Sequence, residues 1–150
     1  MLLITCEHPD QADVRALLAQ SDAFSAALYP PGDSHRIDMD ALLAPEVRFF
    51  VARLNQRMVG CGALVGQADG QAELKRMIVS ADMRRKGVGR ALISAIETAA
   101  AQAGLRSIRL ETGPKSIAAL RLYRSCGYRE RAAFGAYQPS PHSVFMQKDI

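Results

Sequence analysis

The feature that most constrains the fold is a basic, glycine-containing loop placed directly before a long amphipathic helix. The loop reads Arg84-Arg85-Lys86-Gly87-Val88-Gly89, an R-x-x-G-x-G pattern. Apolar residues then recur at helical spacing, which predicts a helix over 87–103 that Gly104 ends. A strand-like run over 73–79 precedes the loop. The order strand, glycine loop, helix predicts an α/β fold in which a helix N-terminus is available to an anion.

The rest of the chain alternates strand-like runs with helical ones, and it contains no internal repeat or linker. Strands are predicted over 2–6, 48–54, 58–65, 73–79, 107–112, 128–131 and 143–148, and helices over 10–24, 37–43, 87–103 and 117–126. Asp10 is the expected N-cap of the first helix. The pattern therefore predicts a single domain over residues 1–150, built on a mixed α/β sheet.

The net charge of +4 is the sum of two halves of opposite sign. Residues 1–72 carry 5 basic and 9 acidic side chains, whereas residues 73–150 carry 14 basic and 6 acidic ones. A basic half indicates an anionic partner, which is either a nucleic acid or a phosphate-bearing small molecule.

Composition argues against several classes of protein. The apolar runs are far shorter than the roughly 20 residues that span a bilayer, and the first residues do not resemble a secretory signal. Cys6, Cys61 and Cys126 lie far apart with no C-x-x-C pair, which argues against a disulfide framework and predicts small buried hydrophobes. The histidines lack metal-ligand spacing. We therefore expect a cytoplasmic protein with no membrane partner and no metal.

The basic loop is suited to phosphate because a helix N-terminus exposes unpaired backbone N–H groups and the positive end of the helix dipole. Gly87 and Gly89 are expected to let the backbone approach the ligand, since a Cβ there would obstruct it. The loop is not a dinucleotide fingerprint, because Leu92 stands in the place of the third glycine. It is not a Walker loop either, because no G-K-[ST] follows.

Further motifs accompany the loop at fixed spacing. They are the strand over 72–79, Leu110-Glu111-Thr112, and Leu122-Tyr123-Arg124-Ser125-Cys126-Gly127-Tyr128, an L-Y-x-x-x-G-[FY] pattern. On these motifs the chain resembles the GNAT superfamily of acetyl-CoA-dependent N-acyltransferases over residues 49–148. The resemblance implies a sheet of about seven strands flanked by helices and splayed between its fourth and fifth strands. It also implies direct acetyl transfer, in a ternary complex, to a primary amine of a small molecule or peptide.

The resemblance also implies which residues bind acetyl-CoA. Main-chain groups of Met77 and Val79 would bond the pantetheine arm, and the N–H of Met77 or Ile78 would hold the oxyanion. The pyrophosphate would lie on the backbone of the loop and first helical turn, formed by Arg84, Arg85, Lys86, Gly87, Val88, Gly89 and Arg90. Ser116 stands where the family often has an asparagine that contacts the arm.

Glu73 is the first candidate for the base that takes a proton from the amine, directly or through a water. The alternative is a strand carboxylate paired with Lys75 or an arginine. Glu111, on the neighbouring strand, is the second candidate. Strand alternation is expected to place Glu73, Lys75 and Met77 on one face.

Tyr123 occupies the position of the general acid that would protonate the departing sulfur; the alternative is a core tyrosine. Candidates for the acceptor pocket are Tyr29, His35 and Tyr137. The alternative is that the histidine lies in a solvated loop and that the tyrosines pack on the surface. Acidic residues of the first half, Asp33, Asp38 and Asp40, either favour a cationic amine near the cleft or form a solvated face.

Two other functions remain open at this point. One is an acyl-CoA-binding sensor without catalysis, and the other is a nucleic-acid-binding module that uses the basic half. The aromatic residues are not interleaved with basic ones as stacking platforms, which argues against nucleic acid. A homodimer is the commonest assembly for a soluble protein that associates.

Overall fold

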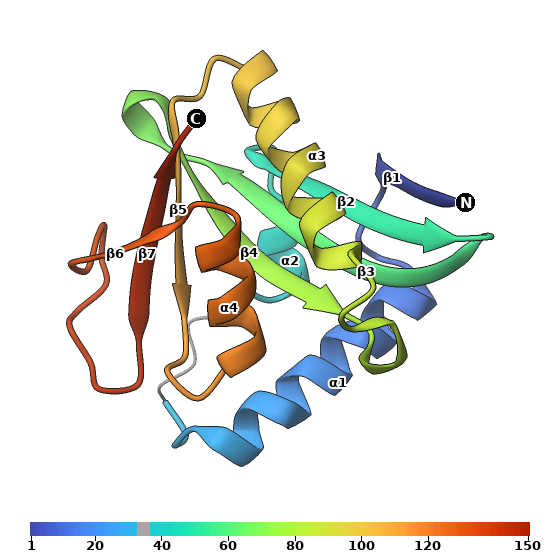
Figure 1. Ribbon diagram of the computed structural model, residues 1–150, viewed down its shortest axis with the longest axis horizontal. Helices are drawn as coiled ribbons and strands as arrows, with labels where there is room; N and C mark the ends of the chain where they lie inside the picture. The colour runs from blue at the N-terminus through green and yellow to red at the C-terminus, as the bar shows by residue number, and fades with distance from the viewer. Residues whose placement is uncertain (33–36) are drawn as a thin grey trace.

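A computed structural model describes residues 1–32 and 37–150 and contains a seven-stranded sheet in the order β1-β2-β3-β4-β5-β7-β6 (Figure 1). The strands are β1 (Leu2–Cys6), β2 (Val47–Leu54), β3 (Arg57–Gly66), β4 (Gln71–Val79), β5 (Ser107–Thr112), β6 (Arg129–Arg131) and β7 (Val144–Asp149). The helices are α1 (Ala12–Leu28), α2 (Met39–Leu42), α3 (Val88–Gln102) and α4 (Ile117–Ser125), with short 3-10 turns η1 (Ala68–Gly70) and η2 (Ala81–Met83). The expected mixed sheet with flanking helices is confirmed.

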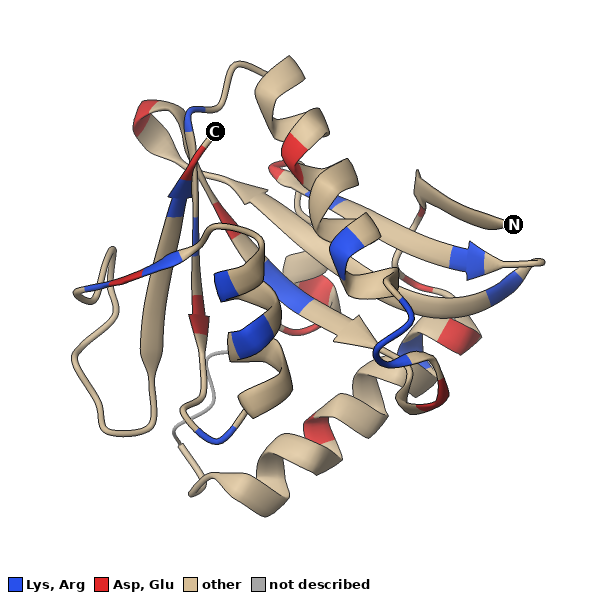
Figure 2. Cartoon of the chain, viewed as in Figure 1, with Lys and Arg blue, Asp and Glu red and all other residues tan. Residues whose placement is uncertain are grey.

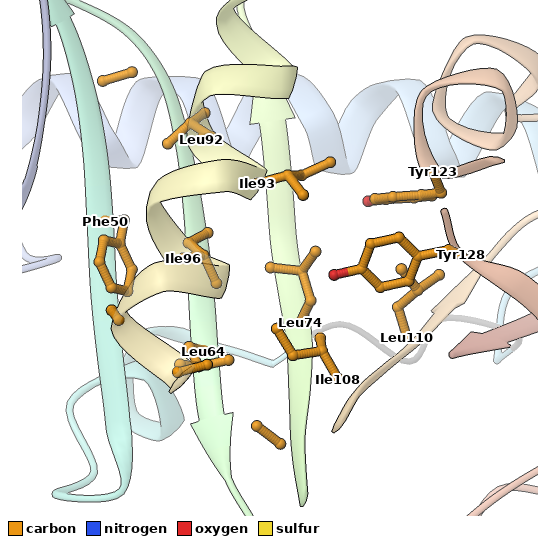
Figure 3. Packing of buried hydrophobic residues seen from close by; sticks show 14 of the residues in the cluster. Phe50, Leu64, Leu74, Leu92, Ile93, Ile96, Ile108, Leu110, Tyr123 and Tyr128 are labelled. Atoms are coloured by element: carbon orange, nitrogen blue, oxygen red, sulfur yellow. The ribbon is translucent and has the colours of Figure 1, made fainter. Parts of the chain in front are cut away.

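The helices cover the two faces of the sheet in separate layers, each with its own hydrophobic cluster. On one face, α3 packs over β1 to β4, most closely on β3, and Leu92, Ile93 and Ile96 of α3 are fully or almost fully buried (Figure 3). Residues of α4 belong to the same cluster. On the other face, α1 packs over β3 and β4 and α2 over β2, and Val14 and Leu42 lie in the second cluster. Burial of these apolar stripes is the main source of stability for such a layered domain.

The hairpin between β2 and β3 is fixed by its two-residue turn. Asn55 and Gln56 both have positive φ angles, 49° and 75°, as the turn type that matches strand twist requires. Leu54 pairs with Arg57 across the turn. The predicted hairpin is confirmed.

The sheet opens between β4 and β5. These strands are the parallel pair of the sheet, and they pair only where 71–73 lies beside 107–109. Beyond Glu73 the two strands diverge, so the edge of β4 over 74–79 has no strand partner on the β5 side within the described residues. The splay that the family resemblance implied is therefore confirmed.

A β-bulge lies in the part of β4 that pairs with β3 but not with β5. Cys61 pairs with Ile78 and Ala63 with Lys75, so one residue of β3, Gly62, faces two residues of β4. The first of these two, Arg76, has a φ of 55°. The bulge reverses the alternation of side chains after Lys75, and Met77 therefore packs with the α3 layer. The expectation that Glu73, Lys75 and Met77 share one face is wrong for Met77.

Two smaller expectations are also corrected. Gln11, not Asp10, is the N-cap of α1, and no side chain caps that helix. The Asp10 carboxylate accepts a hydrogen bond from Arg15 Nε at 2.6 Å. Cys61 is buried, but Cys126 is only partly buried and Cys6 is exposed, since it ends the edge strand β1. Among the described residues, no helix has the length and apolar character that crossing a membrane requires.

Candidate functional site

A cleft of about 1530 Å³ follows the opening between β4 and β5. Its walls are the unpaired part of β4, the loop that leads into α3, the helix α4 and the C-terminal half of α1. Lys and Arg gather on that loop, on the first turn of α3 and on α4 (Figure 2). The cleft therefore joins exposed backbone from β4 to a basic helix N-terminus.

The loop before α3 presents backbone rather than side-chain groups at the helix start. Gly87 is the N-cap with a φ of 84°, and no side chain caps the helix. Arg85 also has a positive φ, 62°, so the chain turns tightly there. Arg84, Arg85 and Arg90 line the cleft, whereas Lys86 is exposed and lies outside its lining. The first N–H groups of α3 therefore have no side-chain acceptor and can receive phosphate oxygens.

The two glycines of the motif have different roles. A Cβ built on Gly87 would contact nothing within 4 Å, so its role there is the left-handed backbone conformation. A Cβ built on Gly89 would lie 2.7 Å from Leu122 Cδ2 of α4. Gly89 therefore makes room for the neighbouring helix α4. That both glycines also let the backbone approach a ligand stays a prediction.

Tyr123 comes from α4 and lies at the buried wall of the cleft. Its side chain is 6% exposed, and its ring meets that of Tyr128 edge to face at a centroid distance of 5.9 Å (Figure 3). Burial raises the pKa of the Tyr123 hydroxyl above its ordinary value of about 10, with smaller contributions from Cys126 and Glu111. The hydroxyl is therefore protonated at neutral pH, as a proton donor must be.

Glu73 carries the densest group of polar contacts in the cleft. It is 6% exposed, and its Oε2 accepts from the Tyr137 hydroxyl at 2.5 Å and from Lys75 Nζ at 3.3 Å. Its Oε1 accepts from Gln67 Nε2 at 3.1 Å. Lys75 Nζ also donates to the Tyr137 hydroxyl at 2.8 Å, so Glu73, Lys75 and Tyr137 form a closed triangle. Glu73 is therefore paired with Lys75, as the alternative interpretation expected, and it also lines the cleft.

The triangle is supported from β5 and from the long loop before β7. Arg109 lies beside Glu73 in the sheet register and donates to Gln67 Oε1 at 2.5 Å. Its guanidinium stacks on Phe134, 4.6 Å from the ring centroid, and burial lowers its pKa. Tyr137 packs against Phe134 as well. The sequence did not predict Gln67 and Arg109, because the turn between β3 and β4 brings Gln67 to Glu73, and the parallel register of β4 and β5 brings Arg109.

Glu111 lies on the cleft one strand away from Glu73. Its Oε2 accepts a hydrogen bond from Ser143 Oγ at 2.8 Å. His142, the residue before that serine, also lines the cleft, and its ring lies 6.3 Å from that of Tyr29. Glu111 is thus a second carboxylate in the cleft, held by the loop that precedes β7.

Tyr29 closes the cleft where α1 ends. Its hydroxyl is 3.2 Å from Ser116 Oγ and accepts from the backbone N–H of Lys115 at 3.0 Å. It lies so close to the backbone that a Cβ on Gly113 would come within 1.8 Å of it. Ser116 therefore binds Tyr29, and this contact ties the start of α4 to the end of α1.

In the part of the chain that the structure describes, the other candidates for the acceptor pocket are not found in the lining of the main cleft. Tyr137 lines a second, smaller cavity rather than the main cleft. His35 and Asp33 lie outside the described residues. Of the described acidic residues in the first half, none lines the cleft, and Asp38 instead accepts a hydrogen bond from Ala41 N to cap α2. The idea that this half gives the cleft an acidic wall is therefore not supported.

Comparison with known proteins agrees with this arrangement. A family model described as the acetyltransferase (GNAT) family matches residues 14–128. A protein of Azospirillum brasilense named IAA acetyltransferase is 39% identical over 148 residues, which cover 98% of this chain and 97% of that protein. A Bacillus subtilis protein named uncharacterized N-acetyltransferase YsnE is 34% identical over 123 residues, covering 81% of this chain and 82% of that one.

Solved structures share the same architecture. A Klebsiella pneumoniae structure assigned as an acyl-CoA N-acyltransferase superposes with a TM-score of 0.84 at 37% identity, over 99% of this chain and 97% of that one. A Bacillus subtilis acetyltransferase in complex with CoA superposes with a TM-score of 0.75 at 21% identity, over 100% and 99% of the two chains. That second similarity supports the fold.

Proposed function

Because the chain belongs to the GNAT family of acetyltransferases, we propose that it moves the acetyl group of acetyl-CoA to a primary amine of a small molecule or peptide, by direct transfer in a ternary complex. The observation that carries this proposal is the cleft itself. It brings an unpaired strand edge, an uncapped helix N-terminus, a buried carboxylate and a buried, protonated tyrosine into one space.

The residues of the cleft fit acetyl-CoA, which supplies the activated acetyl thioester. The unpaired edge of β4 over 74–79 offers N–H and C=O groups to an extended amide-containing arm, by strand addition. We assign this role to Met77, Ile78 and Val79. The pyrophosphate site is assigned to the backbone of 84–90, with Arg84, Arg85 and Arg90 adding charge. Ser116 is assigned no direct contact, because its hydroxyl is bound to Tyr29.

We assign Glu73 as the base. An aliphatic ammonium has a pKa of roughly 10.4, so the amine must lose a proton before its nitrogen can attack. Glu73 lines the cleft with its carboxylate held in place by several donors, which fixes where a proton can be received. Glu111 is the alternative base, acting directly or through a water, and its contact with Ser143 holds it in the same cleft.

We assign Tyr123 as the acid that protonates the departing thiolate. Its hydroxyl is buried at the cleft wall and keeps its proton because burial raises its pKa. The oxyanion would be stabilised by a backbone N–H at the bulge, from Met77 or Ile78, where the strand alternation is broken. A single domain, a cytoplasmic location and a homodimer complete the proposal.

The test is a titration with acetyl-CoA by calorimetry, followed by a CoA-release assay. The panel of acceptors would contain amines, amino acids and peptides, together with the acceptor for which the Azospirillum relative is named. We expect micromolar or tighter binding of acetyl-CoA and acceptor-dependent CoA release. Absence of binding would refute the enzyme and the sensor alike. Binding without release across the panel would favour an acyl-CoA-binding sensor.

A further inference from the structure

Glu73 forms part of the wall between two cavities. It lines the main cleft, and it also lines a second cavity of about 700 Å³ beneath the loop that leads to β7. Within the described chain it is the residue that the two linings have in common. The second cavity is otherwise lined by Gln67 and by residues 134–141, several of which are exposed, so it reaches solvent.

Tyr137 approaches Glu73 from the second cavity. It lines that cavity and donates its hydroxyl proton to Glu73 Oε2 at 2.5 Å. Its ring is fixed by Phe134 and Phe145, with centroid distances of 5.1 Å and 5.4 Å. Lys75 Nζ donates to its oxygen at 2.8 Å. A hydroxyl both donates and accepts, so Tyr137 joins the carboxylate to the far side of the wall.

We propose that Tyr137 is a positioning residue that holds Glu73 for proton transfer and then passes the proton to the second cavity. This inference rests on the proposed role of Glu73 as the base. An amine in the main cleft loses a proton to Glu73, and that proton has to leave before the next turnover. With substrates filling the cleft, the side of Glu73 that faces Tyr137 is the open route.

The release step conserves atoms and charge. The O–H bond of the protonated Glu73 breaks, and its proton goes to the oxygen of Tyr137. At the same time the proton that Tyr137 held goes to a water molecule in the second cavity. Glu73 is again a carboxylate and Tyr137 is again a neutral phenol, and no electrons are transferred. The charged groups that face this pair are Lys75 of β4, with Arg109 and Glu111 of β5.

The test is the variant Tyr137→Phe, which removes the hydroxyl and keeps the ring contacts. We expect kcat for CoA release to fall about tenfold or more, with KM for acetyl-CoA unchanged. At fixed pH and ionic strength, raising the concentration of imidazole should restore the rate of this variant but not change that of the wild type. A small base that enters the second cavity can take the proton from Glu73 in place of Tyr137.

Tyr128→Phe is the matched control, because it removes a buried tyrosine hydroxyl that lines neither cavity. It should retain wild-type kcat and show no response to imidazole. Melting curves and acetyl-CoA affinity of both variants establish that the fold is intact. A Tyr137→Phe enzyme with wild-type kcat, or with a lower kcat that imidazole does not restore, would overturn the proposal. A rise in the acceptor KM alone would overturn it too, because Tyr137 would then bind the acceptor.

Glu73→Gln separates this inference from the proposed function. If that variant turns over like the wild type, the base is another group, and both the assignment of Glu73 and the role of Tyr137 fail. If it is inactive while Tyr137→Phe is normal, the enzyme and its base stand and only the role of Tyr137 fails.

Discussion

The two ends of the cleft differ in the kind of group that they present, which is backbone at one end and side chain at the other. At the end that we assign to acetyl-CoA, called the phosphate end below, the groups available for binding are backbone groups of one segment of the chain, which runs from the edge of β4 beyond Glu73 to the loop before α3. At the end that we assign to the acceptor, called the acceptor end below, the available groups are side chains from β4, β5 and the loop before β7, which meet only in the folded protein. The first end depends on the path of one segment, and the second on the contacts among several.

This difference predicts how each end responds to substitution. Backbone groups survive most side-chain changes, so the phosphate end should be sensitive mainly where a glycine sets the path of the chain. Side-chain groups are lost one by one, so the acceptor end should fail on a single conservative replacement. Each of the following predictions tests one side of that contrast.

The largest effect is expected at Glu73. Glu73→Gln keeps the shape of the side chain but cannot take a proton, so kcat should fall by about 10²- to 10⁴-fold. The dissociation constant of acetyl-CoA, measured by calorimetry, should stay within about twofold of the wild type, because Glu73 belongs to the other end of the cleft. Glu111→Gln is the paired control. A large loss of kcat there, with Glu73→Gln nearly normal, would transfer the role of base to Glu111.

Tyr123→Phe should lower kcat by about tenfold to a hundredfold, since a thiolate leaves slowly without a proton donor. Burial raises the pKa of this hydroxyl, so the wild type should keep its donor protonated up to and beyond pH 10. A profile of kcat against pH tests the sign of that shift. A decline centred below pH 9 that disappears in Tyr123→Phe would contradict a donor with a raised pKa.

The same contrast explains how much the sequence could predict. The motif around Gly87 and the helical pattern after it are local, and the element order and the splayed sheet were predicted from them and from the family resemblance. The bulge at Arg76 was not predicted, because the register shift depends on how β3 pairs with β4 and not on β4 alone. The contact between Glu73 and Tyr137 joins residues 64 positions apart, which no local pattern specifies.

Gly89 shows the same limit of prediction within a motif. The sequence shows that Gly89 has no side chain, but not which neighbour needs the space. The ligand was the neighbour that the motif predicted, and Leu122 of α4 is a neighbour that it did not predict. A helix–helix contact depends on how α4 packs, and that is settled by tertiary structure rather than by the spacing of two glycines.

Gly89→Ala should therefore act through packing. Its Cβ would lie 2.7 Å from Leu122 Cδ2 and 3.5 Å from Val79 Cγ2, so the free energy of unfolding should fall by about 1–3 kcal/mol. Because the Leu122 side chain lines the cleft and must move, acetyl-CoA should also bind more weakly. Urea denaturation and calorimetry measure the two effects. Unchanged stability together with weak binding would instead return Gly89 to the role of a ligand contact.

Gly87→Ala should cost about 1 kcal/mol of stability through its left-handed backbone alone, since nothing lies near its Cβ. Gly104→Ala is the matched control, because that residue has a similar φ of 81°, open space around it and no place in the cleft. Both variants should lose similar stability by urea denaturation. Only Gly87→Ala should weaken acetyl-CoA binding, and equal binding by the two would remove Gly87 from the phosphate site.

The smallest effects are expected from the basic side chains of the loop. Arg84→Gln and Arg85→Gln should each raise the dissociation constant of acetyl-CoA by less than about fivefold, because exposed charges are screened by solvent and salt. Lys86→Gln should change it least, since Lys86 does not line the cleft. Calorimetry at low and high salt tests this, and the differences should shrink as salt rises. A fiftyfold loss from one arginine, unaffected by salt, would mean that side chains bind the phosphates directly, and the two ends of the cleft would then work alike.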